Sequence, residues 1–316
     1  MNESLNPSLV SAALRNAFPY LRLYQGKYFV VKAGGEAFAE VGARRALLEQ
    51  VSILFRLGIK VVLVHGGGPQ LTRTTERLGL EPVFVDGRRV TCAETLEAAA
   101  MVLNGSVNAS ILAGLRELTT SAVGVSGIDG GLITATRRVG AKAAVDFGHV
   151  GDIQHVDPRV LIKLLDDGFL PVVSPLCCNT AGELLNVNAD SVAARIAVAL
   201  NAAKLVFMTG APGVLRDAKD PSSVISYTDI KGLAALKEER AFQDGMLPKV
   251  SAIAEALDGG VDRVHVISHR VPDSLLIEVF TNEGAGTLVV LDTQRLTEKE
   301  IESSSASSAI AAGGRE

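Results

Sequence analysis

The run Tyr28-Phe29-Val30-Val31-Lys32-Ala33-Gly34-Gly35 is apolar up to a single lysine and ends in two glycines. The run Val61-Val62-Leu63-Val64-His65-Gly66-Gly67-Gly68-Pro69-Gln70 follows the same pattern. Such runs predict buried strands, and glycines at a strand-to-helix turn let backbone N–H groups approach a ligand. Pro69 suits the first turn of a following helix, whose N-terminus favours an anion. The alternative interpretation is that the glycines serve only tight turns and close packing.

Similar strand-like runs recur along the chain, and segments with the apolar spacing of helices lie between them. Strands that alternate with helices predict parallel βαβ units. We therefore expect an α/β fold, a three-layer αβα sandwich with a mainly parallel open sheet, whose ligands bind at the carboxyl ends of the strands. The further strand runs are 122–125, 171–173, 205–208 and 264–267, and the helical stripes lie within 47–55, 192–199 and 250–257.

The composition is that of an ordinary globular protein. A chain of 316 residues, 47% hydrophobic and 21% charged, suggests about two domains or one large α/β unit. The 31 lysines and arginines against 35 acidic residues give a net charge of −4, which gives no support to a nucleic-acid partner. No run of 18 apolar residues occurs, so we expect no membrane span.

The cysteines and the N-terminus indicate the compartment. Cys92, Cys177 and Cys178 form neither a disulfide framework nor a CxxC site, and the first residues lack the features of a secretory signal. A reducing cytoplasm is therefore expected. The histidines show no HExxH spacing and the chain has no GxSxG elbow, so we expect neither a zinc site nor an α/β-hydrolase.

Five charged residues have positions that suggest chemistry. Lys32 ends an apolar strand, where its ammonium group would point into the crevice, although a solvated lysine is the alternative. Lys249 lies in the first turn of a helix, where a cation opposes the helix dipole and so suggests a nearby anion. Asp190 precedes a helix, either as a plain N-cap or as a carboxylate that orients both lysines. Arg88 and Arg89 suit a bidentate grip on a carboxylate, and a solvated pair is the alternative.

Together these segments resemble the amino acid kinase family, and most closely the N-acetyl-L-glutamate kinases, in order over about residues 12–290. A single glycine loop is weak evidence, whereas an ordered set of motifs is strong evidence. The motifs are VVKAGG (30–35), VHGGGPQ (64–70), GRRVT (87–91), MVLNGSVN (101–108), VGVSGIDGGLI (123–133), GHVGDI (148–153), NVNAD (186–190), DGMLPKV (244–250), RVPDSLL (270–276) and EGAGT (283–287).

The resemblance implies an ATP- and Mg²⁺-dependent enzyme of arginine biosynthesis that phosphorylates the side-chain carboxylate of N-acetyl-L-glutamate. Carried over by motif, Lys32 and Lys249 would stabilise the transferring phosphoryl group, and Asp190 would hold both lysines in place. No protein metal site is implied, because Mg²⁺ would be held mainly through the nucleotide phosphates. The implied substrate-binding residues are Gly67, Gly68, Arg89 and Asn186, and the implied nucleotide-binding residues are Gly34, Gly35, Thr209, Gly210 and Gly245.

The resemblance also implies an organisation of the chain. Residues 1–25 would form an N-terminal oligomerisation helix, 26–200 an acyl-amino-acid-binding lobe and 201–295 a nucleotide-binding lobe, while the composition of 296–316 predicts a disordered tail. In the arginine-inhibited members this helix interlaces dimers into a hexamer, a trimer of dimers. The corresponding allosteric residues are Tyr20, Glu283 and Gly286, which leaves open arginine as an effector and a PII-type signalling protein as a regulatory partner.

Three positions depart from the family pattern. Glu36 stands where the family usually has asparagine, Gly210 where it has aspartate, and Asp273 where arginine-inhibited members have histidine. Two alternatives therefore stay open beside the kinase. One is a non-catalytic arginine-sensing protein on the same fold, and the other is a kinase for a related acyl-amino acid, such as an aminoadipate derivative.

Overall fold

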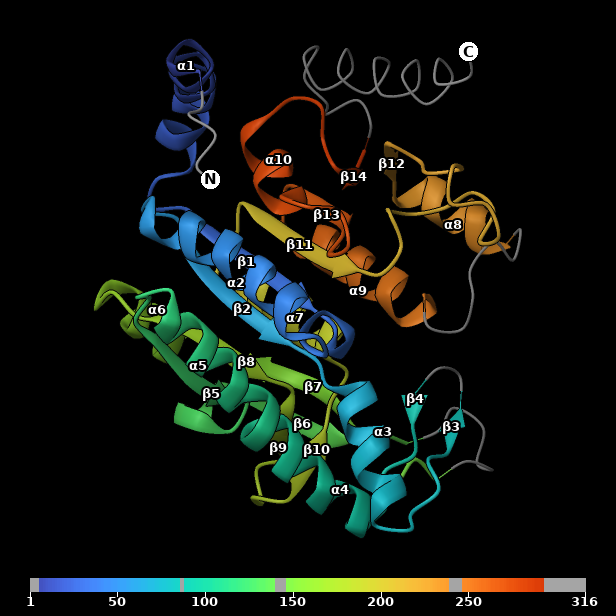
Figure 1. Ribbon diagram of the computed structural model, residues 1–316. Helices are drawn as coiled ribbons and strands as arrows, with labels where there is room; N and C mark the ends of the chain where they lie inside the picture. Colours follow the sequence, from blue (N-terminus) through green and yellow to red (C-terminus); the bar gives the residue numbers. More distant parts are fainter. Residues whose placement is uncertain (1–5, 86–87, 140–145, 239–245, 293–316) are drawn as a thin grey trace.

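A computed structural model describes residues 6–85, 88–139, 146–238 and 246–292. Its centre is an eight-stranded sheet with the order β12-β14-β13-β11-β1-β2-β8-β5 (Figure 1). Neighbouring strands run parallel except β13 and β14, so the expected mainly parallel open sheet is confirmed. The strands are β1 (Tyr28–Ala33), β2 (Lys60–His65), β5 (Ala122–Ser126), β8 (Leu170–Ser174), β11 (Lys204–Thr209), β12 (Tyr227–Asp229), β13 (Val264–Ser268) and β14 (Gly286–Val290).

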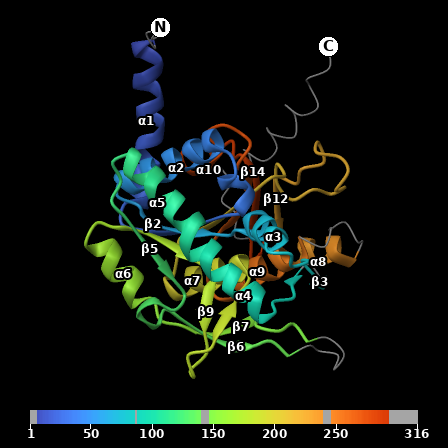
Figure 2. The same ribbon diagram turned by 60° about the horizontal axis from the view of Figure 1, so that its bottom comes forward.

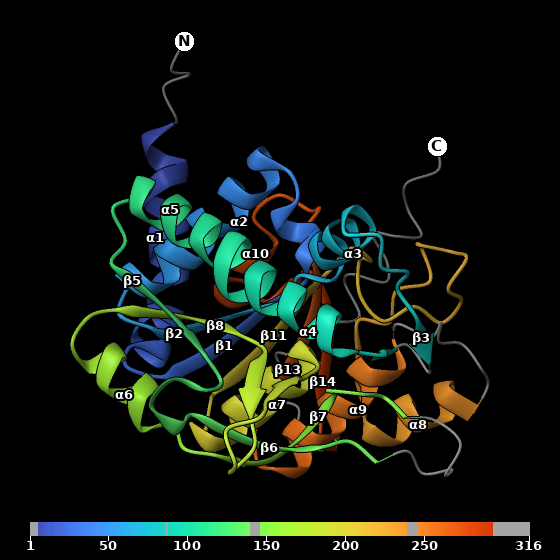
Figure 3. The ribbon, with the colours of Figure 1, turned by 90° about the horizontal axis from the view of Figure 1, so that it is seen from below.

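Helices cover both faces of this sheet, as Figure 3 shows for the layers on either side of β8, β1 and β11. Successive side chains of a strand point to opposite faces. Val30 of β1 therefore packs in one core cluster and Val31 in the other. The first face is covered by α6 (Arg159–Asp166), α7 (Ala189–Ala199), α8 (Ile230–Glu238) and α9 (Leu247–Asp258), and the second by α2 (Val41–Arg56), α5 (Asn108–Glu117) and α10 (Ser274–Phe280).

A four-stranded second sheet and a short hairpin were not expected. The second sheet has the order β10-β9-β6-β7 and extends the first half of the molecule at the carboxyl end of the main sheet. Its strands are short or irregular, and β6 and β7 are paired through a bulge. The elements are β6 (Ile133–Arg137), β7 (Gly151–Val156), β9 (Leu176–Cys178), β10 (Leu184–Asn186), and the hairpin strands β3 (Phe84–Val85) and β4 (Arg88–Arg89).

One long helical stretch, Ala93–Glu117, crosses a face of the sheet (Figure 2). It comprises α4 (Ala93–Ala99), the π-helix η2 (Ala100–Val107) and α5. Among the described residues it is the one helix long and apolar enough to cross a membrane, with a mean hydropathy of 1.4. Its side chains Leu103, Ile111 and Leu115 are buried in the core against the sheet. One face of this stretch therefore packs on the core, and 44% of its most apolar part is buried.

The N-terminal end of the chain forms a helix, whereas the last described residue is 292. Helix α1 (Pro7–Tyr24) projects from the body beside α10 (Figures 1 and 2). Strands β1 and β11 pair directly, so the two expected lobes share one sheet. The expected tail 296–316 lies outside the described residues. The remaining short helices are η1 (Gly35–Phe38), α3 (Gly68–Arg77) and η3 (Asp129–Gly131).

Candidate active site

A cavity of about 570 Å³ lies at the carboxyl ends of β1, β2 and β11. Its lining comes from both halves of the chain, and the first turns of α3, α7 and α9 contribute to it. Gly245 lies outside the described residues. All the other expected catalytic, substrate-binding and nucleotide-binding residues line this one cavity: Lys32, Gly34, Gly35, Gly67, Gly68, Arg89, Asn186, Asp190, Thr209, Gly210 and Lys249.

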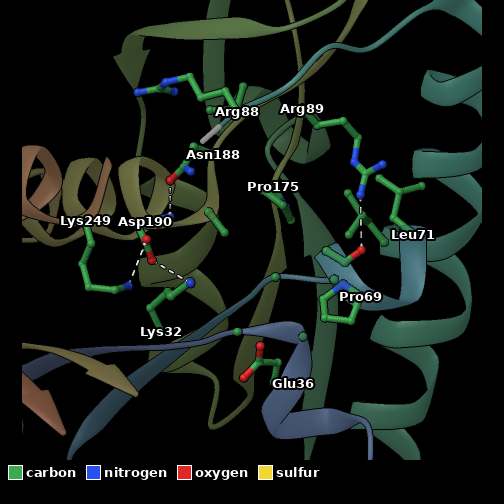
Figure 4. A pocket seen from close by; sticks show the side chains of 18 of the residues that line it. Lys32, Glu36, Pro69, Leu71, Arg88, Arg89, Pro175, Asn188, Asp190 and Lys249 are labelled. Carbon is green, nitrogen blue, oxygen red and sulfur yellow. Dashed lines mark hydrogen bonds and ion pairs between the residues drawn. The ribbon is translucent and has the colours of Figure 1, made fainter. Parts of the chain in front are cut away.

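Both expected lysines approach the same carboxylate. Asp190 Oδ1 lies 2.6 Å from Lys32 Nζ, and Asp190 Oδ2 lies 3.0 Å from Lys249 Nζ (Figure 4). The three residues are only 7–8% exposed, so Lys32 is not the solvated side chain that was its alternative, and Lys249 is buried as well. Lys32 reaches Asp190 because it points to the same face of β1 as Val30, and that face packs against α7. Lys249 Nζ also lies 4.8 Å from the ring centroid of Phe207, which sequence reasoning did not identify.

The N-cap interpretation of Asp190 is wrong. Asn188 is the N-cap of α7, and its side chain accepts hydrogen bonds from the Asp190 and Ser191 N–H groups. Asp190 lies inside the first turn, where its carboxylate is favoured by the helix dipole. Because Asn188 satisfies the backbone, the side chain of Asp190 is left for the two lysines.

Burial and charge act against each other in this cluster. Burial by itself would raise the pKa of Asp190, but the charges of Lys32 and Lys249 outweigh it and hold that pKa below its ordinary value. Burial lowers the pKa of Lys249 to about 8, although Asp190 opposes this change. Two cations against one carboxylate leave a net positive charge in a dry site, which suits a phosphate.

The two glycine loops pack against each other. A Cβ on Gly35 would lie 2.3 Å from Gln70 Oε1 and 2.9 Å from the Gly67 Cα, so no side chain fits there. A Cβ on Gly67 would lie 2.6 Å from Leu103 Cδ2. Gln70 Nε2 donates a hydrogen bond to Gly35 O at 2.7 Å and joins the loops. Close packing is therefore confirmed for Gly35 and Gly67, and because both line the cavity, their approach to a ligand stays a prediction.

Arg89 lies across the cavity from the lysines, and the solvated-pair interpretation does not hold for it, because it is only 9% exposed (Figure 4). Its Nη2 donates to Thr72 Oγ1 at 2.5 Å, and its guanidinium lies 4.7 Å from the Phe84 ring centroid. Its Nη1 is buried without a hydrogen-bond partner among the described residues. Burial lowers its pKa. A buried cation with an unused donor fits a ligand carboxylate.

Asn186, the last residue of β10, lines the same cavity as Arg89. Its Nδ2 donates to Thr91 Oγ1 at 3.3 Å. Gly148 adopts φ +68°, and a Cβ there would lie 2.2 Å from Thr91 O, so this glycine lets the GHVGDI segment pass close to Thr91. The three motifs thus meet at Thr91, and Arg89, Val150 and Asn186 of these motifs line the cavity.

The departures Glu36 and Gly210 are neighbours. Arg270 Nη2 lies 3.9 Å from Glu36 Oε2. A Cβ on Gly210 would lie 3.3 Å from each of these two atoms, so the charged pair occupies the space above Gly210. Both charged side chains are mostly exposed, and Glu36 faces Arg270 at the cavity edge rather than the lysines. Sequence reasoning did not foresee this pairing.

A metal centre built by the protein is not found in the described part of the chain, where no three His, Cys, Asp or Glu side chains gather as ligands. The carboxylates at the cavity are Asp190, which two lysines neutralise, and the exposed Glu36. Among the described residues, neither carboxylate belongs to a cluster of metal ligands.

A second cavity of about 680 Å³ lies between α1 and the segment before β14. It brings together Tyr20, Glu283 and Gly286, which the resemblance implies as allosteric residues. The Tyr20 hydroxyl donates to Asn282 Oδ1. Lys204 and Glu278 also line this cavity.

Comparisons with known proteins agree with this geometry. The model of the amino acid kinase family matches residues 27–268. An acetylglutamate kinase of Myxococcus xanthus is 45% identical over 288 residues, which cover 88% of this chain and 94% of that protein. An acetylglutamate kinase of Heliobacterium modesticaldum is 43% identical over 284 residues, covering 88% and 96% respectively. A crystal structure of N-acetylglutamate synthase from Neisseria gonorrhoeae, complexed with coenzyme A and N-acetyl-glutamate, is similar to this structure, with a TM-score of 0.80 and 29% identity. The match covers 90% of this chain and 64% of that longer chain.

Proposed function

The chain belongs to the amino acid kinase family and, within it, to the acetylglutamate kinases, and we propose that it transfers the γ-phosphoryl group of ATP to the side-chain carboxylate of N-acetyl-L-glutamate. The observation that carries this proposal is the buried Lys32–Asp190–Lys249 cluster. A carboxylate oxygen forms a bond to the γ-phosphorus while the bond from that phosphorus to the ADP oxygen breaks. The products are N-acetylglutamyl 5-phosphate and ADP.

The chemistry needs charge stabilisation rather than proton transfer. The attacking group is already a carboxylate, so no general base is required. Two anions must be brought together, and fixed cations in a water-poor site lower the cost of doing so. Lys32 and Lys249 supply those cations, and Asp190 positions both ammonium groups. Mg²⁺, held through the nucleotide phosphates, would supply further charge neutralisation.

The remaining cavity residues are assigned to the two substrates. Arg89 binds the α-carboxylate of N-acetyl-L-glutamate, which its unused donor supports. Asn186 binds the acetamido end, and Gly67 and Gly68 contact the amino-acid substrate. The nucleotide phosphates lie against Gly34 and Gly35, and the nucleotide is also contacted by Thr209 and Gly210.

The two alternatives are not favoured. An arginine sensor without activity does not need two buried lysines on one carboxylate in the cavity. A kinase for another acyl-amino acid would share the cluster, and the acetylglutamate kinases at 43–45% identity support acetylglutamate as the substrate.

A hydroxamate assay tests the function. Purified protein with ATP, Mg²⁺ and N-acetyl-L-glutamate is expected to give ADP and an acyl phosphate, which hydroxylamine traps. Turnover with an aminoadipate analogue in parallel reports the substrate. If neither substrate gives a hydroxamate, the protein is not a kinase of this type. If the aminoadipate analogue is turned over faster than N-acetyl-L-glutamate, the phosphoryl acceptor is the longer substrate.

The proposal extends to regulation and assembly. The carboxylate of Glu283 at the second cavity suits the guanidinium of arginine, so arginine is proposed as the effector that binds between α1 and β14. The exposed Leu14 and Phe18 of α1 suit packing against another copy in a hexamer. A cytoplasmic location accords with the free cysteines. Size-exclusion chromatography with and without arginine, together with the assay above, tests these points.

A further inference from the structure

His65, at the end of β2, is one of the buried titratable groups that the mechanism leaves unused. Its side chain is fully buried beside the glycine loop, and its ring lies edge-on to Phe38. Its Nε2 lies 3.1 Å from Asn108 Nδ2, and its Nδ1 lies 3.1 Å from Gly66 O. Asn108 is the last residue of the MVLNGSVN motif. The phosphoryl-transfer mechanism assigns no role to this motif.

The partners fix the orientation of the Asn108 amide. Its Nδ2 also lies 3.2 Å from Val172 O, and a backbone carbonyl accepts hydrogen bonds but never donates them. The NH₂ group must therefore face both Val172 and His65. The amide oxygen points the other way, toward Gly124, where a Cβ would lie 2.0 Å from it. Gly124 thus gives the amide the space that this orientation needs.

The amide in turn fixes the proton on His65. Because Asn108 donates to Nε2, that nitrogen must be the acceptor, and Nδ1 carries the proton of the neutral ring. Nδ1–H then donates to Gly66 O. Burial, with a smaller effect from the charge of Lys32, lowers the pKa of His65 to about 4, so the ring stays neutral at ordinary pH.

The bond to Gly66 O has a consequence for the next peptide N–H. The described residues contain no cis peptide bond, and in a trans peptide the C=O and the following N–H point in opposite directions. A carbonyl turned toward the buried His65 therefore turns the Gly67 N–H away from it. Gly67 lines the cavity, and its N–H makes no hydrogen bond to any described residue. Leu103 of the π-helix backs the loop from behind.

We propose that His65 is a positioning residue: Asn108 holds it in its Nδ1–H form, and through Gly66 O it aims the Gly67 N–H into the cavity as a donor to the reacting oxygen atoms. The kinetic part of this inference rests on the proposed phosphoryl transfer, whereas the orientation of the proton does not. Preorganised N–H donors of this kind stabilise the charge that develops in a transition state.

The first test is ¹⁵N NMR of the histidine-labelled full chain, which needs no turnover. His65 is expected to show the Nδ1–H form with no titration between about pH 5 and 9. An Nε2–H form, or protonation within that range, would overturn the proposal whatever the enzyme's activity.

The second test compares two variants in the hydroxamate assay. His65→Asn keeps an N–H donor near the Nδ1 position, whereas His65→Gln places its amide near Nε2 and loses the bond to Gly66 O. We expect kcat of His65→Gln to fall about 10²-fold with KM for both substrates nearly unchanged, and His65→Asn to keep kcat within about 10-fold. Equal losses in the two variants, or a loss confined to KM, would contradict the positioning role.

A third variant provides a pH signature. Asn108→Asp places an acceptor at His65 Nε2, so the neutral ring would carry its proton there and lose the bond from Nδ1, while the charged ring would keep both protons. The kcat of this variant is expected to fall as pH rises through the raised pKa of His65, in addition to the loss above about pH 8 that Lys249 causes in the wild type. A kcat–pH profile that matches the wild type would oppose the proposal.

Discussion

Asp190 and Lys249 form a buried ion pair between the first turns of two helices, with 3.0 Å between Oδ2 and Nζ. The pair explains why a lysine stands where it opposes a helix dipole. The dipole of α7 favours the carboxylate of Asp190 in its first turn, and this carboxylate in turn stabilises the Lys249 cation at the start of α9. Since Lys32 shares the same carboxylate, removal or titration of any of the three groups is expected to affect the other two.

The pH dependence of the enzyme follows from Lys249. Burial lowers its pKa to about 8, and the group acts only while charged, so its contribution is present below this pH and is lost as pH rises through it. We expect kcat/KM to fall tenfold per pH unit above about 8. Lys249→Arg, which stays charged, should retain less activity overall but lose this limb. A wild-type profile that stays flat to pH 10 would contradict the role of Lys249.

Each of the two lysines is expected to be needed for a normal kcat. Lys32→Ala or Lys249→Ala should lower kcat on the order of 10²–10³-fold, and the double variant should lose less than the product of the two, because both act on one phosphoryl group. Lys60→Ala is the matched control, since Lys60 pairs with the exposed Asp166 far from the cavity. Steady-state kinetics measures kcat for each variant. If a lysine variant has the wild-type kcat, that lysine does not stabilise the transferring phosphoryl group.

Asp190→Asn should affect stability as well as rate. It leaves two buried ammonium groups without a counter-charge, which typically costs about 3–5 kcal/mol. Because the folded-state pKa of Asp190 is lowered, its contribution is present above the unfolded value of about 4 and is lost as pH falls below it. Urea unfolding should therefore give a lower free energy of unfolding for the variant than for the wild type at pH 7, and this difference in free energy should become smaller at acid pH. A constant difference would mean that the charge of Asp190 is not the cause.

Arg89→Lys should separate the two substrates. A lysine keeps the charge but loses the planar pair of donors, so KM for N-acetyl-L-glutamate is expected to rise about 10- to 100-fold while KM for ATP changes little. Arg159→Ala is the control, because Arg159 is exposed and pairs with Asp157. Equal increases in both KM values would point to damage of the whole cavity.

The packing of the glycine loops gives a stability prediction. Gly35→Ala forces a Cβ against Gln70 and the Gly67 backbone, and should cost about 1–3 kcal/mol. Gly42→Ala, in helix α2 with open space around the added Cβ, should stabilise by up to about 1 kcal/mol. Thermal unfolding measures both, and a neutral Gly35→Ala would mean that the loops separate readily.

Much of the fold was predictable because parallel strands buried on both faces are continuous apolar runs, as in β1 and β2. The second sheet was not, because short strands such as β9 and β10 have no periodicity of their own and are formed by long-range pairing. The antiparallel pairing of β14 with β13 is likewise set by long-range contacts and not by a local pattern.

The candidate site was predicted through residues whose positions conflict with local stability, such as Lys249 at a helix start. Residues that satisfy local rules were harder to assign. NVNAD offers several side chains that suit an N-cap, and only the structure shows that Asn188 takes this place and frees Asp190. The pairing of His65 with Asn108 depends on the packing of α5 against the sheet, which no local pattern reports.

The proposed phosphoryl transfer requires that both ammonium groups reach the same migrating phosphoryl group. The most direct measurement is a crystal structure with ADP, Mg²⁺, N-acetyl-L-glutamate and a planar mimic of that group. Lys32 Nζ and Lys249 Nζ are both predicted to lie about 3 Å from atoms of the mimic. A structure of this complex with either nitrogen more than about 6 Å from the mimic would contradict the account.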